Sequence, residues 1–428
     1  MARKMKDSGI EWIGEIPEGW EITKIKHIVS SVTDIDHFMP DSAEFGIPYL
    51  MIGDLKDLSS SIDWDSSKKI SIEDYKKLSI KSRPQIGDII FARYASIGTT
   101  CYIDTDRDFL VSYACLTIHP SDLIIGKFLS YYLKSSSFAE DVLRRTNSNT
   151  QGNVGKDSLV NATIVLPSII EQTQIVNFLD AKCSDINAML SKTRASIEEY
   201  KKLKQAIITQ AVTKGVRGER KMKDSGVEWV GEIPKEWDIL NLVAHTSMLT
   251  PMRDRPENLD GPIPWIRIED FDGKYISSSK ASLGVSKETV QSMNLKIYPV
   301  GTILCTSSCI MGKCAIVSRE LVSNQRFIGI IPDQNTCENF LYYLMLSNSE
   351  RMNYLATGAL QANLSRSSFE HLKVQFPSYQ EQKEIADYLD AKCAEIDRLI
   401  AKKEQLVKEL ESYKKSLIYE VVTGKREV

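Results

Sequence analysis

The residues of this 428-residue chain that could do chemistry are arginines, lysines, amides and hydroxyls in turn-rich stretches. Arginine and lysine can bind guanine edges, asparagine and glutamine can bind adenine, and hydroxyls and lysines can hold phosphates. The candidate DNA-contacting residues are Arg93, Tyr94, Ser96, Asn149, Gln151, Asn153, Ser307, Ser308, Lys313, Arg326, Gln361, Asn363 and Arg366. Such residues also populate ordinary turns, so both interpretations stay open at this point.

The candidates sit at corresponding places in the two halves of the chain. Arg93 and Tyr94 follow a predicted strand at 88–91, and Ser307 follows a predicted strand at 302–305. An amide-rich loop at 147–153 returns at 361–363, 210 residues later. The recurring loop could serve the common fold or a phosphate contact rather than sequence-specific readout.

No catalytic motif is present in the sequence. It contains no Walker A loop, G-x-G-x-x-G, H-E-x-x-H or G-x-S-x-G, and no Asn/Asp-Pro-Pro-aromatic motif of an amino-methyltransferase. The five histidines are scattered. Cys305, Cys309 and Cys314 cluster but lack a fourth ligand, so packing of a strand and its turn is favoured over zinc. We expect a non-catalytic recognition or scaffold component without a metal.

Cysteine usage and hydropathy bear on the compartment. Eight cysteines without framework spacing favour a reducing environment. The first residues lack an apolar signal segment, and no stretch approaches the roughly 18 apolar residues of a membrane span. We expect a cytoplasmic protein that does not contact a membrane.

The chain is an internal duplication. Residues 5–25 match residues 222–242 at an offset of 217, MKDSGIEWIGEIPEGWEITKI against MKDSGVEWVGEIPKEWDILNL. Residues 167–213 match residues 377–423 at an offset of 210. Each half is therefore a tryptophan motif, a divergent block and a shared ending, which indicates one scaffold with two different readouts, although drift after duplication would look similar.

Both shared endings predict long helices. The first ending contains no glycine or proline from Ile169 to Val212 and opens near an acidic first turn. Both endings carry a heptad seam in the same register. The seam residues expected at the helix interface are Leu179, Ile186, Leu190, Ile197, Tyr200, Ile207, Leu389, Ile396, Ile400, Val407, Leu410 and Leu417. Lys204 and Lys414 occupy one seam position in both copies, either fixing register or extending to water from a frayed end.

The divergent blocks, 26–166 and 243–376, mix short β-rich runs with turns and one helical patch each, so each is predicted to be an α+β domain. The tryptophans of the repeated motif, Trp12, Trp20, Trp229 and Trp237, are expected to clamp these domains against the long helices rather than stack on bases. Four segments follow: 1–166, 167–220, 221–376 and 377–428.

Charge limits what this chain can bind alone. The net charge is −3, and hydrophobic and charged residues make up 42% and 26%, which excludes disordered and polybasic classes. The divergent blocks carry 15 basic against 18 acidic residues and 13 against 12. Neither is a basic domain, so we expect modest DNA affinity without partner subunits.

The two motifs and their duplication resemble the specificity subunit of Type I restriction-modification systems. The resemblance covers nearly the whole chain through D-S-G-[IV]-E-W-[IV]-G-E-I-P-x-x-W and P-S-x-x-E-Q-x-x-I-x-x-[FY]-L-D-A-K-C. It implies two α+β target recognition domains, separated by two long helices that form an antiparallel coiled coil. It also implies that each domain reads one half of an asymmetric bipartite double-stranded DNA target while the helices set the spacing.

The resemblance further implies partners that hold the cofactors. Two modification (methyltransferase) subunits would dock on the helices with S-adenosylmethionine, and restriction subunits would bring ATP and Mg²⁺, leaving none in this chain. Faces such as 200–202 and 413–415 could receive partner helices. A circular organisation, in which the tryptophan motif at the start closes against the end of the chain, is a further hypothesis. The alternative is a coiled-coil adaptor whose α+β domains bind protein.

Overall fold

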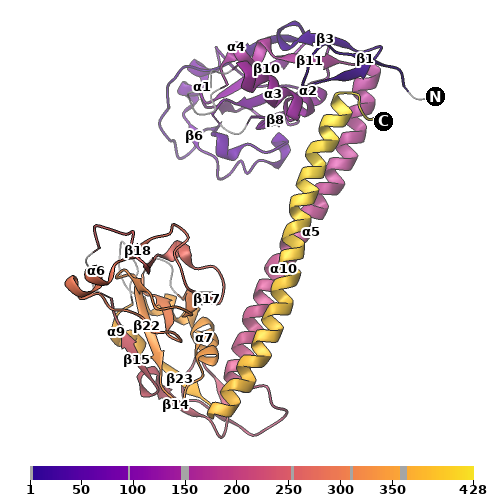
Figure 1. Ribbon diagram of the computed structural model, residues 1–428. Coiled ribbons are helices and arrows are strands. Elements are labelled where there is room, and N and C mark those ends of the chain that lie inside the picture. The colour runs from indigo at the N-terminus through magenta and orange to yellow at the C-terminus, as the bar shows by residue number, and fades with distance from the viewer. Residues whose placement is uncertain (1–2, 95–96, 146–153, 252–254, 309–311, 357–363) are drawn as a thin grey trace. The chain divides into compact units, whose positions relative to one another are not determined.

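The computed structural model describes residues 3–94, 97–145, 154–251, 255–308, 312–356 and 364–428. The chain divides into two compact units, a first unit of residues 1–194 with 405–428 and a second unit of residues 195–404. Each unit joins an α+β domain to parts of two long helices, α5 (Ile169–Lys214) and α10 (Tyr379–Val422) (Figure 1). The compact units differ from four consecutive segments because each long helix contributes to both.

The first unit is built on a four-stranded antiparallel sheet in the order β4-β10-β7-β8 and a three-stranded sheet in the order β6-β5-β9. Two two-stranded ladders, β1-β2 and β3-β11, hold the tryptophan motif and the end of the domain. The strands are β1 (Met5–Asp7), β2 (Glu15–Pro17), β3 (Glu21–Lys24), β4 (Val29–Thr33), β5 (Ile47–Leu50), β6 (Lys69–Ile70), β7 (Ile89–Ala92), β8 (Thr100–Tyr102), β9 (Leu110–Val111), β10 (Cys115–Pro120) and β11 (Thr163–Leu166). The short helices are α1 (Ile72–Leu78), α2 (Gly126–Leu133), α3 (Ser136–Arg145) and α4 (Lys156–Asn161).

The second unit repeats this plan. Its main sheet has the order β15-β22-β19-β20-β17, its smaller sheet β18-β16-β21, and its ladders are β12-β13 and β14-β23. The strands are β12 (Met222–Asp224), β13 (Glu232–Pro234), β14 (Asp238–Asn241), β15 (Thr246–Leu249), β16 (Ile263–Ile266), β17 (Tyr275–Ile276), β18 (Gly284–Val285), β19 (Ile303–Thr306), β20 (Cys314–Val317), β21 (Val322–Ser323), β22 (Phe327–Pro332) and β23 (Lys373–Phe376). The short helices are α6 (Lys287–Ser292), α7 (Glu338–Ser347), α8 (Ser349–Leu355) and α9 (Arg366–Glu370).

The long helices begin and end where their sequence directs. Ser168 and Glu171 form a capping pair at the start of α5, with the Ser168 hydroxyl donating to the Glu171 carboxylate at 2.9 Å. Past the last turns, Gly215 and Gly424 adopt φ of +74° and +73°, a left-handed conformation that terminates a helix and favours glycine. Between these signals nothing interrupts the helical hydrogen bonds of α5.

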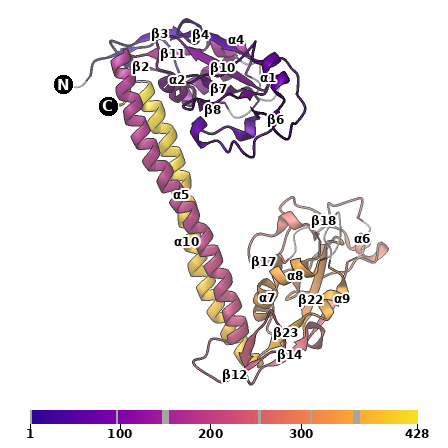
Figure 2. The same ribbon diagram turned by 180° about the vertical axis from the view of Figure 1, so that it is seen from behind.

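Within each unit α5 and α10 run antiparallel, side by side (Figure 2). In the first unit Arg194 pairs with Glu411 at 2.5 Å while Asn187 meets Lys414 at 2.9 Å, so numbers rise along one helix as they fall along the other. In the second unit Lys204 pairs with Asp397 at 2.6 Å in the same sense.

Burial varies along the predicted seam. The members buried in the first unit are Leu179, Ile186, Leu190 and Leu417, and those buried in the second are Ile197, Leu389, Ile396 and Ile400. Tyr200, Ile207, Val407 and Leu410 are only half-buried. Near the end of α5, Ile208 takes the buried place expected of Ile207, because the helix there packs on the α+β domain as well as on α10.

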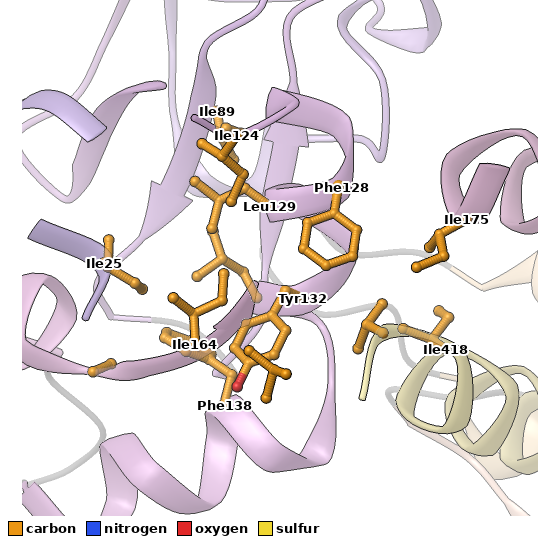
Figure 3. Close-up of a cluster of buried hydrophobic side chains, with 14 of the residues drawn as sticks. Ile25, Ile89, Ile124, Phe128, Leu129, Tyr132, Phe138, Ile164, Ile175 and Ile418 are labelled. Atoms are coloured by element: carbon orange, nitrogen blue, oxygen red, sulfur yellow. The ribbon is translucent and has the colours of Figure 1, made fainter. Parts of the chain in front are cut away.

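Each α+β domain shares one core with the helix ends. In the first unit, Phe128 and Tyr132 of α2 lie between the sheet and the long helices, where Ile175 of α5 and Ile418 of α10 face them (Figure 3). The corresponding core of the second unit includes Phe340 and Leu344 of α7 together with Ile385 and Leu389 of α10. Apolar burial therefore attaches each domain to the helix pair rather than leaving it tethered by a linker.

Candidate functional site

The predicted contact segments meet at one backbone junction in each unit. In the first unit the Arg93 N–H donates to the Ala114 carbonyl at 2.9 Å, and the Val154 N–H donates to the Arg93 carbonyl at 3.0 Å. In the second unit the Ser307 N–H donates to the Arg326 carbonyl at 2.8 Å, and the Leu364 N–H donates to the Ser307 carbonyl at 2.9 Å. We call this shared arrangement the strand-end junction, since it lies at the ends of β7 and β19.

The side chains at the two junctions differ. Tyr94 is exposed beside Arg93 in the first unit, whereas Lys313, Arg326 and Arg366 are exposed in the second. Ser307 and Ser308 are buried, at 9% and 6% exposure, so they support the junction rather than face outward. One backbone arrangement thus carries two unlike surfaces.

Arg93 is already engaged within the domain. Its guanidinium pairs with Asp34 at 3.3 Å, lies 5.7 Å from the centre of the Tyr94 ring, and keeps only 13% of the side chain exposed. Its Nε is buried without a hydrogen-bond partner among the described residues. Arg366 likewise pairs with Glu370 of its own helix at 2.7 Å. A base contact by Arg93 requires it to leave Asp34.

Several predicted contacts fall outside the described residues. These are Ser96, Asn149, Gln151, Asn153, Gln361 and Asn363. The residues that follow the two amide loops, Val154 and Leu364, are described and hydrogen-bond to the junction. The residue after each loop therefore meets the strand end at an equivalent place.

The repeated motifs form a second, matched site where each domain meets its long helix, which we call the helix joint. The Trp20 indole N–H donates to Glu171 at 3.0 Å, and the Trp237 indole N–H donates to Glu381 at 3.0 Å. Arg3 and Arg220 pair with the same two glutamates and lie over the same two tryptophan rings. Trp20 and Trp237 thus clamp onto the long helices.

Trp12 and Trp229 lie under arginines of the α+β domains. The Arg144 guanidinium of α3 is 4.6 Å from the Trp12 ring centre, and that of Arg351 in α8 is 3.9 Å from the Trp229 ring centre. Cation–π contact of this kind holds the short helix before each amide loop against the tryptophan motif.

A buried glutamine is the second element of the helix joint. Gln172 accepts from the Ile125 N–H at 2.8 Å and donates to the Leu123 and Pro167 carbonyls at 3.2 and 3.0 Å. Gln382 accepts from the Cys337 N–H at 2.8 Å and donates to Asn335 and Pro377 in the same way. An amide supplies both a donor and an acceptor, which neither glutamate nor lysine can do at neutral pH.

An aspartate, a tyrosine and a lysine complete the helix joint. The Tyr131 hydroxyl donates to Asp180 at 2.8 Å, and Lys127 pairs with it at 2.6 Å. The Tyr343 hydroxyl donates to Asp390 at 2.6 Å, and Lys274 pairs with that aspartate. Lys127 lies in α2 but Lys274 precedes β17, so two different segments supply the same charge. Burial and the hydrogen bond to the neighbouring aspartate raise the pKa of Tyr131 and Tyr343.

The seam lysines reach carboxylates by two routes. Lys204 pairs with Asp397 of α10 at 2.6 Å. Asn187 replaces this aspartate in the other copy, where Lys414 bonds Asn187 at 2.9 Å and Asp57 of the α+β domain at 3.5 Å. Both lysines thus make polar contacts across the seam, which favours a register role over free extension into water.

Asp57 lines a cavity of about 270 Å³ in the first unit. Lys134 pairs with Asp57 at 2.7 Å, and Lys127, Asp180 and Lys414 also line the cavity. Burial alone would raise the pKa of Asp57, but the Lys134 and Lys414 ammonium groups outweigh it and lower the pKa. Burial would likewise raise the pKa of Glu171, and its hydrogen bonds from Trp20 and Ser168 lower it.

The described part of the chain can be compared with the requirements of a metal site and of a membrane-spanning helix. Its histidines, cysteines and acids form no group of three that could hold a metal ion. Cys305 and Cys314 lie opposite one another on neighbouring strands, and Cys309 lies outside the described residues. No helix within the described ranges is long and apolar enough to cross a membrane.

Two compact units of one plan, each presenting a different surface from the same strand-end junction, define a duplicated recognition protein. Residues 17–199 and 238–410 match the Type I restriction modification DNA specificity domain, so the chain belongs to this family. This confirms the resemblance and the predicted α+β fold with two long helices.

Similar proteins match either nearly the whole chain or about half of it. The putative Type I restriction enzyme MjaX specificity subunit of Methanocaldococcus jannaschii is 27% identical over 426 residues, which cover 96% of this chain and 95% of that protein. The EcoKI specificity subunit of Escherichia coli is 26% identical over 208 residues, 46% of this chain and 44% of that protein.

Solved structures share the fold. A chain from a study of complex assembly and conformational transition of the Type I R-M system aligns with a TM-score of 0.74 at 14% identity, covering 96% of this chain and 99% of that one. The HsdS subunit of Thermoanaerobacter tengcongensis aligns with a TM-score of 0.51 at 14% identity, covering 96% and 98%.

Proposed function

We propose that each α+β domain reads one half of an asymmetric bipartite DNA target. The observation that carries this proposal is the strand-end junction, because its backbone is the same in both units while its exposed side chains differ. Tyr94 in one unit and Lys313, Arg326 and Arg366 in the other are the described, exposed candidates for contact with bases or phosphates. Arg93 would join them by exchanging Asp34 for DNA.

The strand-end junction also supports proposed roles for the remaining predicted residues. The two amide loops, with Asn149, Gln151 and Asn153 in one and Gln361 and Asn363 in the other, lead directly into the junction, so they would reach the same stretch of DNA. Ser96 follows Tyr94 by two positions in the sequence. Ser307 and Ser308 would hold the turn, since their side chains are buried.

The long helices would set the distance between half-sites and dock the modification subunits. Large apolar residues remain exposed at one recurring heptad position, Met189, Leu406 and Tyr413 in the first unit and Leu203 and Leu399 in the second. Exposed apolar side chains on otherwise charged helices are typical of protein interfaces. Tyr413 and Leu203 lie within or beside the faces 413–415 and 200–202 expected to receive partner helices.

The partners would be double-stranded DNA, two modification subunits and the restriction subunits, with S-adenosylmethionine, ATP and Mg²⁺ held outside this chain. The M. jannaschii relatives are named as specificity subunits of Type I restriction enzymes, which supports DNA recognition over the protein-binding adaptor. Because the chain's net charge is −3, a positively charged partner would have to supply much of the DNA affinity.

An exchange of one domain tests the proposal. Residues 243–376 are replaced by the corresponding block of another family member, the protein is coexpressed with its modification subunit, and methylated bases are mapped across the host genome. We expect one half of the methylated sequence to change while the other half and the spacing stay. A reciprocal exchange of 26–166 should change the opposite half. Change in both halves, or a complex that leaves DNA unmodified, would contradict the proposal.

A further inference from the structure

Two thiols face each other directly beneath the turn of the second unit. Cys305 of β19 and Cys314 of β20 are register partners in an antiparallel pair, and their sulfur atoms are 2.9 Å apart. Both thiols are free and buried, at 0% and 5% exposure. They are the last pair of this ladder before the turn that carries Ser307, Ser308 and Lys313.

The ladder places this pair where a disulfide fits. The neighbouring residues on the turn side, Thr306 and Lys313, form a hydrogen-bonded pair, with the Thr306 N–H donating to the Lys313 carbonyl at 2.9 Å. Since hydrogen-bonded and non-hydrogen-bonded pairs alternate, Cys305 and Cys314 form a non-hydrogen-bonded pair, in which Cα atoms are about 4.5 Å apart. Disulfides span Cα distances of about 4.4–6.8 Å, so the bond can form with little backbone movement.

The first unit offers no equivalent. The corresponding strand pair is β7-β8, where Phe91 lies opposite Thr100. The two thiols therefore belong to the divergent part of the second unit, like the side chains at its strand-end junction, and not to the scaffold that both halves share.

We propose that Cys305 and Cys314 are an oxidation site, converted to a disulfide by a small-molecule disulfide such as glutathione disulfide, which cross-links β19 to β20 beside Ser307 and Lys313. Its effect on DNA binding rests on the proposed function, since Ser307, Ser308 and Lys313 lie next to the two strands that the disulfide joins. The site itself depends only on the geometry of β19 and β20.

The reaction balances as two thiol–disulfide exchanges. The Cys314 thiolate, the more exposed of the two, attacks the reagent, forms a mixed disulfide and releases one thiolate. Cys305 then gives up its proton and displaces the second thiolate, so two protein thiols and one reagent disulfide become one protein disulfide and two reagent thiols. Burial and the hydrogen bond with Cys314 raise the pKa of Cys305 and so lower its thiolate fraction, and the second step therefore depends on its proximity to the Cys314 sulfur.

Peptide mapping tests the site in the intact protein. The full-length chain is incubated with glutathione disulfide, free thiols are alkylated, and the digest is analysed by mass spectrometry. We expect a peptide that joins Cys305 to Cys314, forming over minutes to hours, and a midpoint of thermal unfolding raised by roughly 3 °C. Both changes should disappear in Cys305→Ser and in Cys314→Ser, and persist in Cys115→Ser, a buried strand cysteine of the first unit. Full alkylation of both cysteines, or a bond to Cys309 instead, would overturn the proposal.

DNA binding separates this proposal from the one on which it rests. Oxidised and reduced protein, in complex with the modification subunit, are titrated with a duplex that carries the mapped target. We expect oxidation to weaken binding about fivefold or more, the cost of one poorly read base pair, and only when the half-site of the second domain is intact. Equal affinities of the two forms would refute regulation by this thiol pair, whereas bipartite recognition would still stand on the methylation map.

Discussion

Single buried polar residues decide how each domain is attached. Gln172 is fully buried, and all three of its hydrogen bonds run to backbone groups of the α+β domain or of the helix start. Gln382 repeats the pattern with 2% exposure. Burying a polar group without a hydrogen-bond partner costs more free energy than a satisfied hydrogen bond contributes. The side chain at this position must therefore be an amide, which can donate and accept at once.

Gln172→Glu tests this requirement. The ionised carboxylate would face two carbonyl oxygens that need donors, and we expect a loss of about 2–4 kcal/mol in the free energy of unfolding at pH 7. The loss should shrink as pH falls and the carboxyl protonates, because the buried group would have a raised pKa and regain a donor. Gln382→Glu should behave alike. Gln174→Glu, an exposed change two residues along α5, should cost less than about 0.5 kcal/mol. Chemical denaturation across pH measures all three, and equal losses at positions 172 and 174 would contradict the argument.

The lowered pKa of Asp57 predicts that the stability of the first unit depends on pH. Its folded pKa is lowered, so its contribution to stability is present above the ordinary carboxyl value and is lost as pH falls through the folded pKa. Asp57→Asn should therefore lower the midpoint of thermal unfolding by roughly 2 °C at pH 7, and the difference from the parent protein should shrink steadily as pH falls below the ordinary carboxyl value. A difference that persists undiminished at acid pH would show that the effect comes from packing and not from charge.

At the scale of elements, the two copies satisfy one seam position differently. Asp397 on α10 neutralises Lys204 within the helix pair, whereas Lys414 depends on Asn187 and on Asp57 from the α+β domain. The first domain is consequently coupled to the seam by a charge that the second does not supply. Two differences produce this asymmetry: asparagine stands at 187 where aspartate stands at 397, and the first domain supplies Asp57.

Asn187→Asp should remove that dependence. The new carboxylate lies where Asp397 lies in the second unit, so Lys414 would gain a partner on α5. In an Asn187→Asp background we expect Asp57→Asn to cost less than half of what it costs alone, as measured by a double-mutant cycle on thermal unfolding. The control is Asn161→Asp, which introduces a carboxylate outside the seam. It should leave the cost of Asp57→Asn unchanged. Additive effects at positions 57 and 187 would refute the coupling.

The sequence predicts the elements better than their contacts. A stretch free of glycine and proline with a capping start and a heptad pattern leaves little alternative to α5 and α10. Gln172 and Asp180 fall inside the matching motif, yet their roles depend on Ile125 and Tyr131 in the divergent block, which no local pattern links to them. Asp57 is one of many loop aspartates without a repeated counterpart. The sequence places Ser307 and Ser308 just after a predicted strand. Their burial could not be predicted, because it depends on how three segments distant in the sequence meet at the junction.

At the scale of the whole chain, the duplication gives each unit an equivalent connection between the end of a long helix and the arginine of the helix joint. In the second unit residues 214–219, the first of which is the last residue of α5, connect Thr213 to Arg220 at the helix joint. In the first unit α10 ends before Thr423, and Arg3 occupies the place of Arg220 against Glu171 and Trp20. Arg3 and Val428 line one cavity of about 260 Å³, and Lys425 donates to the Ile13 carbonyl at 2.6 Å.

These connections predict that the chain tolerates circular permutation. Joining Val428 directly to Met1 would place seven residues, 424–428 and 1–2, between Thr423 and Arg3, against six in the second unit, so no added linker is needed. New ends opened between Gly218 and Glu219 would fall in the equivalent connection, away from both cores. We expect the permutant to unfold within a few degrees of the parent and to direct methylation to the same bases, since the two helix joints stay intact. Opening the chain between Ile89 and Ile90, inside the main sheet, should abolish folding. If the permutant opened at 218 also failed to fold or to assemble with the modification subunit, the two connections would not be equivalent, and the circular organisation would have to be given up.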